Sequence, residues 1–444
     1  MKVRDMKVLF VHYEEDHFCR EKPLTVFERV PFGISYISAV LKEEGHQTSV
    51  VVPTRESVEA VEEHIRDFDP GLVCFTGVYS AFGFLSGVAG RVKKRYPDLF
   101  LVLGGPHASL DPEGCLESDF DAVCVGEGEY PTLELAAQLE DGRSPKGIPN
   151  LYIKRGAAVE RNRPRPFMED LDSLPFPDRG IWLPWLAQPL SRPSVLAGRG
   201  CPFDCTYCCN HALRNVAEGK YVRLRSPESI VSELTWIKSV LPDLEDVYLE
   251  VETLGANRRW AVELSLALER MNRGFQVPMA FGANLRLTPN IDYEESGSER
   301  LRREVLKRNY SNHDVIRAID TAHSYGLKVG TFNLVGIPGE TRKEFRETVR
   351  LNRLCRPDYF MLSVFFPYPG TELYRVCRER GLLDGSLDSV LERRRPVLDL
   401  PGFSKRQIRR SFNWSTVTFN RGRMSWRAAR SGDMTMTPSR LRTS

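Results

Sequence analysis

The stretch GRGCPFDCTYCCNH occupies residues 198–211 and contains four of the ten cysteines in a chain of 444 residues. Cys201, Cys205 and Cys208 follow the spacing C-x3-C-x2-C, and Cys209 stands directly beside the last of them. Because thiols on one short loop can converge on one metal centre, the stretch predicts a metal site. Two kinds of site are open: zinc with His211 as a fourth ligand, and an iron–sulfur cluster whose three thiolates leave one iron open.

The composition is that of a folded soluble protein, with 41% hydrophobic and 27% charged residues and a net charge of +3. We expect no membrane span, because no apolar run approaches the roughly 20 residues that one requires. The first residues, MKVRDMKVLFVHYEED, turn acidic where a signal peptide needs an apolar core. We therefore expect a cytoplasmic protein, in which clustered thiols stay reduced and are metal or redox ligands rather than disulfides.

The first 140 residues predict an α/β domain with a Rossmann-like parallel sheet. Apolar runs at 6–13, 48–53, 71–78, 99–105 and 121–129 alternate with helical patterns at 31–47 and 56–68. Strands that are apolar on both sides are typical of a parallel sheet covered by helices on both faces. Such sheets bind ligands beyond the carboxyl ends of their strands, which here are TGVYS (76–80), GGPHAS (104–109) and GEGE (126–129). These glycine-rich ends are either ligand-binding loops or ordinary tight turns.

Residues 141–193 are rich in proline and aromatic residues and predict an ordered linker. A second series of strand–helix units follows in residues 194–385. Its expected strands are 194–198, 246–251, 278–285, 328–336 and 359–367, and its expected helices are 227–240, 257–272, 298–308, 312–325 and 340–354. Repeated units of this size predict a full or partial (β/α) barrel, with its functional groups on the loops after the strands.

The cysteine stretch lies directly after the first strand of this predicted barrel, with a glycine before it and Tyr207 before the third cysteine. In this position it resembles the radical S-adenosylmethionine (radical SAM) family. The resemblance implies that Cys201, Cys205 and Cys208 hold a [4Fe–4S] cluster, that SAM binds the open iron, and that Tyr207 packs near the adenine. Cys209 is then a surplus thiol, which could replace Cys208 only at a spacing that the family rarely uses.

The N-terminal sheet resembles the cobalamin-binding domain that precedes the barrel in one large subclass, through PFGISYISAVLKEEGH, VLGGPHAS and VGEGE. The resemblance implies that three strand ends surround the cobalamin. The implied contacts are Tyr79, Ser80, Gly104, Gly105, Pro106, Glu127, Gly128 and Glu129. The D-x-H-x-x-G signature of other cobalamin proteins is absent, since EEDHFC (14–19) does not match it, and we expect no histidine ligand to cobalt.

In the barrel, the resemblance implies a set of SAM contacts on the strand ends. Glu252 in VYLEVETLGANRR (247–259) is our choice for binding the SAM amino group, with Glu250 as second choice. The other implied contacts are Asn284 and Arg286 in FGANLRL (281–287), Glu295 and Ser296, and Asn333 in FNLVGIPGET (332–341). FFPYPGTELY (365–374) is typical of the subclass at the end of the barrel.

One departure from the family lies in LRLTPNIDYEESGSER (285–300). Arg286 and Glu295 are nine positions apart, whereas two parallel strands need a crossover of about a dozen residues or more. The spacing therefore predicts a barrel that lacks one βα unit. Either the barrel closes with fewer strands or the chain is an impaired variant, and both interpretations stay open.

Residues 386–444 form a C-terminal extension whose part from residue 405 has ten Lys and Arg against one acid, Asp433. We expect this basic tail to be a solvated, disordered end, with phosphate binding as the alternative. Modification of RNA through this tail is a further alternative, although we expect no nucleic-acid partner.

The resemblance implies a cobalamin-dependent radical SAM enzyme, and we expect a methyltransferase that acts on an unactivated carbon through a 5′-deoxyadenosyl radical and methylcobalamin. The alternatives are a cyclase or rearrangement enzyme without methyl transfer, and a catalytically impaired protein that binds cluster or cobalamin. The implied partners are a small-molecule or natural-product substrate and an external one-electron reductant of flavodoxin or ferredoxin type.

Overall fold

The computed structural model describes residues 5–15, 22–24, 30–188, 192–285, 296–383, 387 and 392–420. The chain divides into two compact units. The first comprises Met1–Asp204 and Cys209–Asn284, and the second comprises Cys205–Cys208 and Leu285–Ser444. The predicted barrel of residues 194–385 is thus shared between both units.

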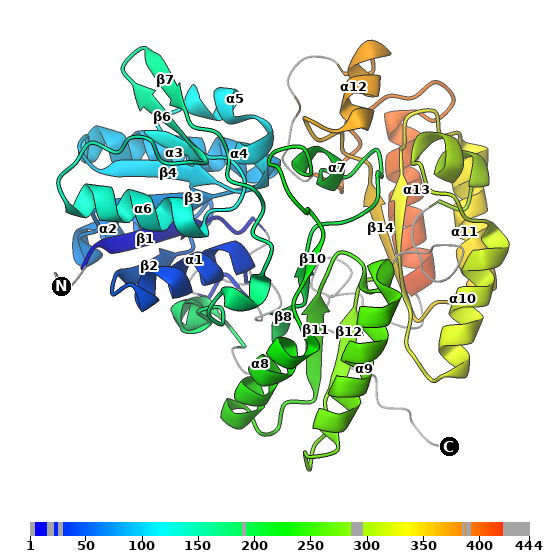
Figure 1. Cartoon of the computed structure of the whole chain (residues 1–444). Helices are drawn as coiled ribbons and strands as arrows, with labels where there is room; N and C mark the ends of the chain where they lie inside the picture. Colours follow the sequence, from blue (N-terminus) through cyan, green and yellow to red (C-terminus); the bar gives the residue numbers. More distant parts are fainter. Residues whose placement is uncertain are drawn as a thin grey trace. The chain divides into compact units, whose positions relative to one another are not determined.

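The first unit begins with a seven-stranded sheet in the order β2-β1-β3-β4-β5-β6-β7 (Figure 1). Five strands are parallel: β1 (Lys7–His12), β2 (Gln47–Val51), β3 (Leu72–Thr76), β4 (Phe100–Gly104) and β5 (Ala122–Cys124). The hairpin β6 (Leu151–Arg155) and β7 (Ala158–Arg161) continues the sheet in antiparallel fashion. The expected parallel sheet is therefore confirmed.

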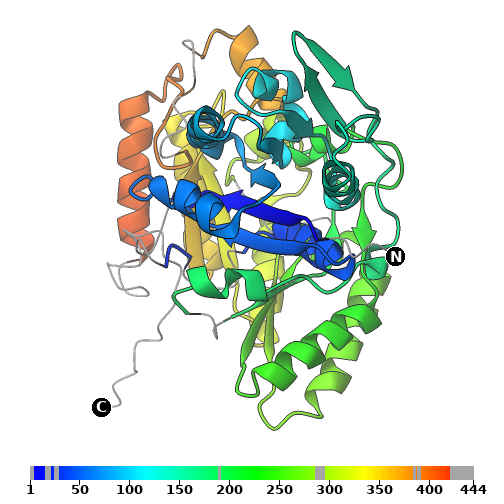
Figure 2. The same ribbon diagram turned by 90° about the vertical axis from the view of Figure 1, so that its left-hand side faces the viewer.

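Helices cover both faces of this sheet (Figures 1 and 2). Successive side chains of a strand point to opposite faces, so Val8 and Phe10 belong to one core cluster and Leu9 and Val11 to another. Helices α1 (Phe32–Glu43) and α6 (Glu129–Glu140) complete the first cluster. The second is completed by α2 (Glu59–Phe68), α3 (Tyr79–Arg95), α4 (Pro106–Leu110) and α5 (Pro112–Leu116).

The hairpin β6–β7 lies inside the predicted linker of residues 141–193, so the linker prediction was wrong for residues 151–161. Further along, the 3-10 helix η3 (Gly180–Trp185) places Trp182 completely inside the first core cluster. Its indole Nε1 donates to Ser35 Oγ at 2.9 Å. The segment is ordered because its aromatic side chains fill the core of the sheet domain.

The first unit also contains three parallel strands of the predicted barrel, in the order β12-β11-β8. They are β8 (Ser194–Leu196), β11 (Asp246–Glu250) and β12 (Ala280–Ala283). Helices α8 (Pro227–Val240) and α9 (Arg258–Asn272) lie side by side and bury Leu234 and Leu264 with Val247 in one core cluster. A short ribbon pairs β9 (Gly198–Arg199) with β10 (Arg223–Leu224) in antiparallel fashion.

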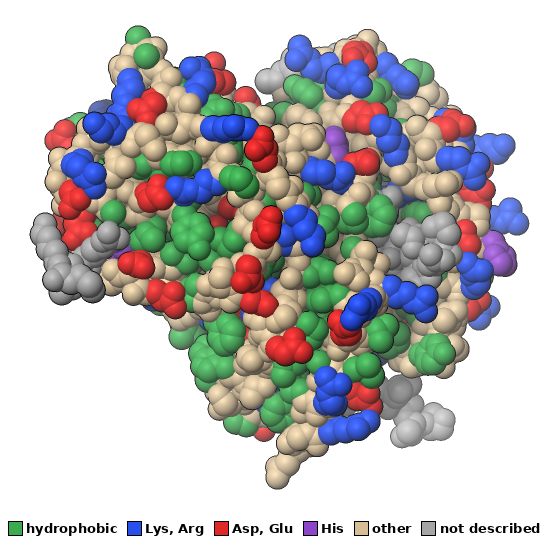
Figure 3. Space-filling view, in the orientation of Figure 1, with side chains coloured by type: hydrophobic (Ala, Val, Ile, Leu, Met, Phe, Trp, Pro, Cys, Tyr) green, Lys and Arg blue, Asp and Glu red, His purple; other side chains and the backbone are tan. Residues whose placement is uncertain are grey.

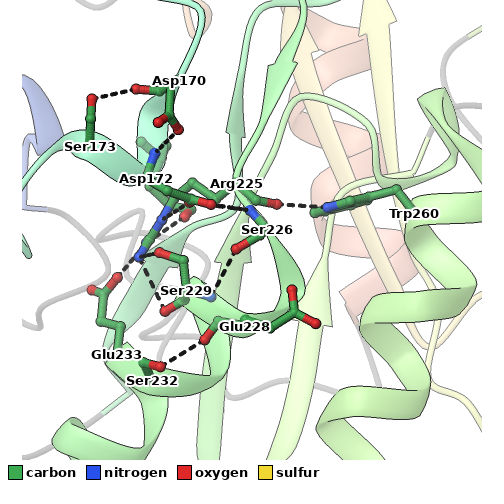
Figure 4. A network of polar contacts seen from close by, with 11 residues as sticks. Asp170, Asp172, Ser173, Arg225, Ser226, Glu228, Ser229, Ser232, Glu233 and Trp260 are labelled. Atoms are coloured by element: carbon green, nitrogen blue, oxygen red, sulfur yellow. Dashed lines mark hydrogen bonds and ion pairs between the residues drawn. The ribbon is translucent and has the colours of Figure 1, made fainter.

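A buried polar network anchors the start of α8 (Figure 4). Nη1 of Arg225 donates to the carboxylate of Glu233, which is fully buried and also accepts from Arg179 Nη2 at 2.5 Å. The carbonyl of Arg225 accepts from Trp260 Nε1 at 2.7 Å, which ties α9 to the same point. Because one carboxylate faces two guanidiniums, these buried charges are paired.

The second unit is built on the parallel pair β13 (Gly330–Val335) and β14 (Tyr359–Val364). Its helices are α10 (Asn312–Ser324), α11 (Arg342–Cys355), α12 (Glu372–Glu379) and α13 (Lys405–Asn420). The expected helix at 298–308 is shorter than predicted: residues 299–305 are helical, and the last five form the π-helical segment η5 (Leu301–Val305). Among the described residues no strand lies between β12 and β13, and residues 286–295 are outside them.

The expectation of a disordered basic tail from residue 405 was wrong for residues 405–420, which form α13. This helix packs along β14, and Figure 2 shows it beside the strands of its unit. Phe403, just before the helix, and Ile408 within it are completely buried, so apolar packing holds the segment in place. The prediction relied on charge and did not include these two anchors.

The described helices include none that is long and apolar enough to cross a membrane. On the face shown in Figure 3, Lys and Arg side chains alternate with Asp and Glu. This mixture agrees with the small net charge of +3.

Candidate functional site

The turns after β3 and β4 pack tightly against each other at the carboxyl edge of the first sheet. The amide of Gly77 donates to the carbonyl of Gly104 at 3.3 Å. Gly105 has a φ of +100°, and a Cβ on it would lie 2.8 Å from the carbonyl oxygen of Gly77. Only glycine fits this position, because the turn after β3 fills the space that a side chain would need.

The third turn, after β5, is linked to the other two through Ser109. Its hydroxyl donates to the carbonyl of Gly105 at 3.1 Å and accepts from the amide of Gly126 at 2.9 Å. Since β3, β4 and β5 are neighbours in the sheet, the predicted cobalamin contacts lie at three adjacent strand ends. Tyr79 and Ser80 begin α3, and Pro106 begins α4 and is exposed.

His107 lies in the same region but is buried among aromatic rings. Its ring meets Tyr79 edge-on at 5.3 Å and Phe82 at 4.7 Å between centroids. Burial lowers the pKa of His107. This histidine is therefore a neutral part of the core under the edge.

The structure gives Glu127 and Glu129 a role that the sequence did not suggest. Arg199 donates from Nη1 to Glu127 Oε1 at 2.8 Å and from Nη2 to Glu129 Oε1 at 2.6 Å. Burial raises the pKa of Glu127, but the charges of Arg199 and Arg223 outweigh this and hold it below its usual range. The carboxylate of Glu127 is thus ionised. Both side chains are bound by arginine within the first unit, and their contact with cobalamin stays a prediction.

The first half of the cysteine loop, residues 200–204, is held by backbone contacts of the first unit. Gly200 has a φ of +81°, and a Cβ on it would lie 2.2 Å from the carbonyl oxygen of Tyr221. The guanidinium of Arg214 donates to the carbonyls of Cys201 and Phe203 at 2.9 and 3.1 Å. The backbone around Cys201 is therefore fixed from two sides.

The second half, Cys205–Cys208, belongs to the second unit. Thr206 Oγ1 donates to the carbonyl of Val305 at 2.6 Å, and the carbonyl of Thr206 accepts from the amide of Leu373 at 3.0 Å. The amide of Cys208 donates to the carbonyl of Cys205 at 3.0 Å, which closes a turn. Tyr207 accepts a hydrogen bond from Arg308, whose guanidinium lies 5.5 Å from the ring centroid.

Cys209 stabilises the start of a helix through its backbone, which does not account for its thiol. It is the N-cap residue of the short helix α7 (Asn210–Leu213), and its carbonyl accepts from the amides of Ala212 and Leu213 at 3.0 and 2.9 Å. It belongs to the first unit, whereas Cys208 belongs to the second. The change of unit thus falls between the two neighbouring cysteines.

Cys201, Cys205 and Cys208 offer the type of donor atom, thiolate sulfur, that an iron–sulfur cluster requires. Cys205 is buried, whereas Cys201 and Cys208 are partly exposed. No group of three or more His, Cys, Asp and Glu side chains among the described residues is close enough to hold a metal ion. Three thiols on one loop remain the soft ligand set that such clusters require, and we keep them as a prediction.

Among the predicted SAM contacts of the first unit, Glu252 lies just beyond β11 and is exposed. Asn284 follows β12, where its Oδ1 accepts from the hydroxyl of Tyr248 at 2.7 Å and its carbonyl accepts from the amide of Leu254 at 3.0 Å. Both residues thus lie at carboxyl ends of adjacent barrel strands, where the sequence placed them.

In the second unit, Asn333 is directed into a buried cluster under α11. Its Oδ1 accepts from Asn352 Nδ2 at 2.8 Å, and its Nδ2 donates to Thr331 Oγ1 at 3.2 Å. The side chain of Asn333 therefore links α11 to β13. Ser296 is also buried, and its carbonyl accepts from Arg302. Arg286 and Glu295 lie outside the described residues.

Glu340 follows β13 and was not singled out from the sequence. It is completely buried, and its Oε2 accepts from the amides of Gly336 and Ile337 at 2.6 and 3.2 Å. Oε1 is buried with no hydrogen-bond partner among the described residues. Burial raises the pKa of Glu340 to about 8, although the two backbone hydrogen bonds lower it.

Sequence reasoning also missed Arg199, Arg223 and Arg308, which act through partners far away in the chain. A signal was present only for Arg199, which stands two positions before Cys201.

Two family models match the chain. The B12-binding domain model matches residues 26–136, and the radical SAM superfamily model matches residues 288–351. The second match covers part of the barrel and does not include the cysteine loop. The two domains occur in the order that the sequence predicted.

Three curated relatives match most of the chain. An uncharacterized methyltransferase of Pyrococcus horikoshii is 28% identical over 88% of this chain and 87% of its own length. The anaerobic magnesium-protoporphyrin IX monomethyl ester cyclase of Rubrivivax gelatinosus is 24% identical over 78% and 66%. The hopanoid C-3 methylase of Methylococcus capsulatus is 26% identical over 84% and 72%.

Two solved structures share the fold. The radical SAM methyltransferase TsrM of Kitasatospora setae, with cobalamin and a [4Fe–4S] cluster bound, aligns with a TM-score of 0.63 and 18% identity over 85% of this chain and 75% of its own. The cobalamin-dependent radical enzyme OxsB, with aqua-cobalamin and SAM bound, aligns with a TM-score of 0.69 and 14% identity over 94% and 67%.

Proposed function

Because this chain belongs to the cobalamin-dependent radical SAM family, we propose that it is a methyltransferase acting on an unactivated carbon of a small-molecule or natural-product substrate. One observation carries the proposal: the glycine-lined sheet edge at Gly105 and the start of the C-x3-C-x2-C loop lie in the same unit. The methyltransferase and methylase names of two relatives favour methyl transfer over other radical reactions.

In this proposal Cys201, Cys205 and Cys208 hold the cluster, and the turns after β3, β4 and β5 hold the cobalamin. When bound, the cluster with SAM supplies a 5′-deoxyadenosyl radical, and cobalamin supplies the methyl carrier. Tyr207, Glu252, Asn284 and Ser296 are the described residues that we assign to SAM. For Asn333 only the backbone is available, because its side chain is occupied by Thr331 and Asn352.

The test is anaerobic reconstitution of the full chain with iron, sulfide and cobalamin. We expect about four irons and one cobalamin per chain, release of 5′-deoxyadenosine from SAM after reduction, and loss of the cluster in C201A, C205A and C208A. C209A is the matched control, because it removes a neighbouring thiol whose contribution to α7 comes from its backbone. Wild-type protein that binds neither group would refute the proposal.

The second candidate is a cobalamin-dependent cyclase or rearrangement enzyme, which the Rubrivivax cyclase favours. A SAM molecule with a labelled methyl group separates the two. Label that reaches the product supports the methyltransferase, and 5′-deoxyadenosine release with an unlabelled product supports the second candidate. Protein that binds cluster and cobalamin but never cleaves SAM is the impaired variant.

The reductant that we propose is an acidic one-electron donor protein of flavodoxin or ferredoxin type in the cytoplasm. Helix α11 carries Arg342, Arg346, Arg350 and Arg353 on one exposed stripe, because their spacing of four, four and three residues follows the helical repeat. Neighbouring α13 adds the exposed Lys405, Arg406, Arg409 and Arg410. The guanidinium of Arg353 lies 5.7 Å from the ring centroid of Trp414, so the two helices touch at this point, and we propose that their exposed cations act as one basic surface.

A further inference from the structure

The strand that leads into the cysteine loop is bound to the turn after β5 by ion pairs. Arg199 ends β9, two positions before Cys201, and its guanidinium is shared between Glu127 and Glu129. Only 3% of the Glu129 side chain and 17% of the Arg199 side chain are exposed. The guanidinium also lies 5.3 Å from the ring centroid of Tyr36 on α1. A largely buried guanidinium that bridges two carboxylates through charge-assisted hydrogen bonds fixes a position more firmly than an exposed pair does.

A second arginine, on strand β10, binds the carboxylate of Glu127 as well. Arg223 pairs with Arg199 across β9 and β10, and its Nη1 donates to both oxygens of Glu127 at 2.9 and 3.0 Å. The same Nη1 donates to the carbonyl of Met168 at 2.9 Å. Glu127, Glu129, Arg199 and Arg223, here named the Arg–Glu cluster, bring two carboxylates and two guanidiniums together in a largely buried place.

The Arg–Glu cluster continues a chain of contacts that begins at the predicted cobalamin edge. The carbonyl of Gly105 accepts from Ser109, and Ser109 in turn accepts from the amide of Gly126, directly before Glu127. Gly126 has a φ of +91°, which favours glycine and limits the shapes that the turn can adopt. A ligand that orders this turn therefore also orders the two carboxylates that hold Arg199.

We propose that Glu127 and Glu129 are positioning residues that couple the binding of cobalamin at the sheet edge to the binding of the iron–sulfur cluster on the cysteine loop. The inference rests on the proposed function and adds a thermodynamic link between its two cofactors. Linkage requires that each cofactor raise the affinity for the other by the same factor, and such factors commonly lie between about 5 and 150. The carboxylates act on the cluster only through Arg199 and need no contact with cobalamin.

The experiment measures the dissociation constant of hydroxocobalamin by its absorbance, with the full chain either carrying the reconstituted cluster or free of it. The ratio of the two constants is the coupling factor. In wild-type protein we expect a factor of about 5 or more. E127Q and E129Q keep the side-chain size but weaken the ion pairs, and we expect their factor, which is a ratio and so does not depend on their basal cobalamin affinity, to fall close to 1.

E134Q is the matched control. Glu134 lies on α6 of the same domain and forms a partly buried ion pair with Arg165 at 2.6 Å, outside the Arg–Glu cluster. We expect it to keep the wild-type coupling factor. R199K covers the case in which the glutamine variants do not fold, because a single ammonium keeps the charge but cannot hold two carboxylates in the same fork geometry. Its factor is expected to lie between 1 and the wild-type value.

Two results would overturn the inference. A wild-type factor of 1 with both cofactors bound shows that no coupling exists, although the proposed function stands. A variant that loses cobalamin affinity equally with and without the cluster shows that the carboxylates contact cobalamin directly. Failure of the proposed function looks different, because wild-type protein then binds neither iron nor cobalamin.

Discussion

Tyr207 is held by Arg308 in two ways: the guanidinium donates to its hydroxyl and lies 5.5 Å from its ring centroid. Arg308 lies about a hundred positions further along the chain, yet it fixes the side chain of Tyr207, which directly precedes Cys208. The orientation of Tyr207 is thus set by Arg308, which lies in the segment after η5. That segment follows residues 285–300, where the sequence spacing predicts that one βα unit is missing.

Replacing Arg308 with alanine should therefore lower stability more than Y207F does. Y207F removes one hydrogen bond, which typically contributes about 1 kcal/mol to the free energy of unfolding, whereas R308A removes the cation–π contact as well. Urea unfolding of the full chain measures both effects. Y325F alters a tyrosine that is 79% exposed and should leave stability unchanged. Equal stabilities of R308A and wild type would contradict the assignment.

Glu340 should make stability depend on pH between its unfolded and folded pKa values. Its carboxyl titrates near pH 4.5 when unfolded and at about 8 in the fold, so the folded state keeps a proton that the unfolded state has lost. Stability from this group is complete below about pH 4.5 and declines as the pH rises towards 8. E340Q, which cannot ionise, should be less sensitive to pH in this window. Unfolding midpoints of both proteins at pH 5 and pH 8 give the comparison, and identical slopes would speak against a protonated Glu340.

Gly200 should tolerate no side chain. G200A would place a Cβ 2.2 Å from the carbonyl oxygen of Tyr221 at a φ of +81°, so the backbone before Cys201 must move. We expect a clear loss of iron after reconstitution, measured by iron and sulfide analysis. G87A is the control, because Gly87 lies within α3 and a Cβ there meets nothing within 4 Å. Wild-type iron content in G200A would disprove the close approach.

Asn333 should contribute to stability and not to SAM affinity. N333A removes the hydrogen bonds of Asn333 with Asn352 and Thr331, each of which typically contributes about 1 kcal/mol, while Asn352 and Thr331 keep the bond between them. Chemical unfolding measures this loss, and equilibrium dialysis of SAM with the reconstituted protein measures binding. A drop in SAM affinity at unchanged stability would show that the side chain contacts SAM after all.

The basic surface of α11 and α13 should make electron delivery sensitive to salt. With an acidic flavodoxin as donor, SAM cleavage should slow as the ionic strength rises, because exposed charges are screened beyond about 10 Å at 0.1 M salt. R346E with R350E should slow it further, while dithionite-driven cleavage stays at the wild-type rate. K328E, a charge change on an exposed residue outside both helices, is the control. Rates that are independent of salt with both donors would exclude this docking surface.

Much of the fold could be predicted because it is encoded locally. Strands that are apolar on both sides indicate a parallel sheet from a short segment each. The expected strands agree with β1 to β4 to within two residues, whereas β5 (Ala122–Cys124) ends five residues before the expected strand 121–129. The thiol spacing is equally local. The proline content of residues 141–193 predicts a linker. It does not reveal the hairpin β6–β7, whose pairing partner β5 lies outside that segment.

The sequence by itself thus determined the order of the two domains, the parallel strands and the candidate thiols, because repeat patterns and spacings act between near neighbours in the chain. Only the tertiary structure decided what Glu127, Glu129 and Asn333 bind. Their partners Arg199 and Asn352 come from other segments, and charge or polarity alone does not indicate which distant group a side chain will meet. Folding decided that choice by burying carboxylates beside guanidiniums and amides beside hydroxyls, since buried polar groups are stable only when paired.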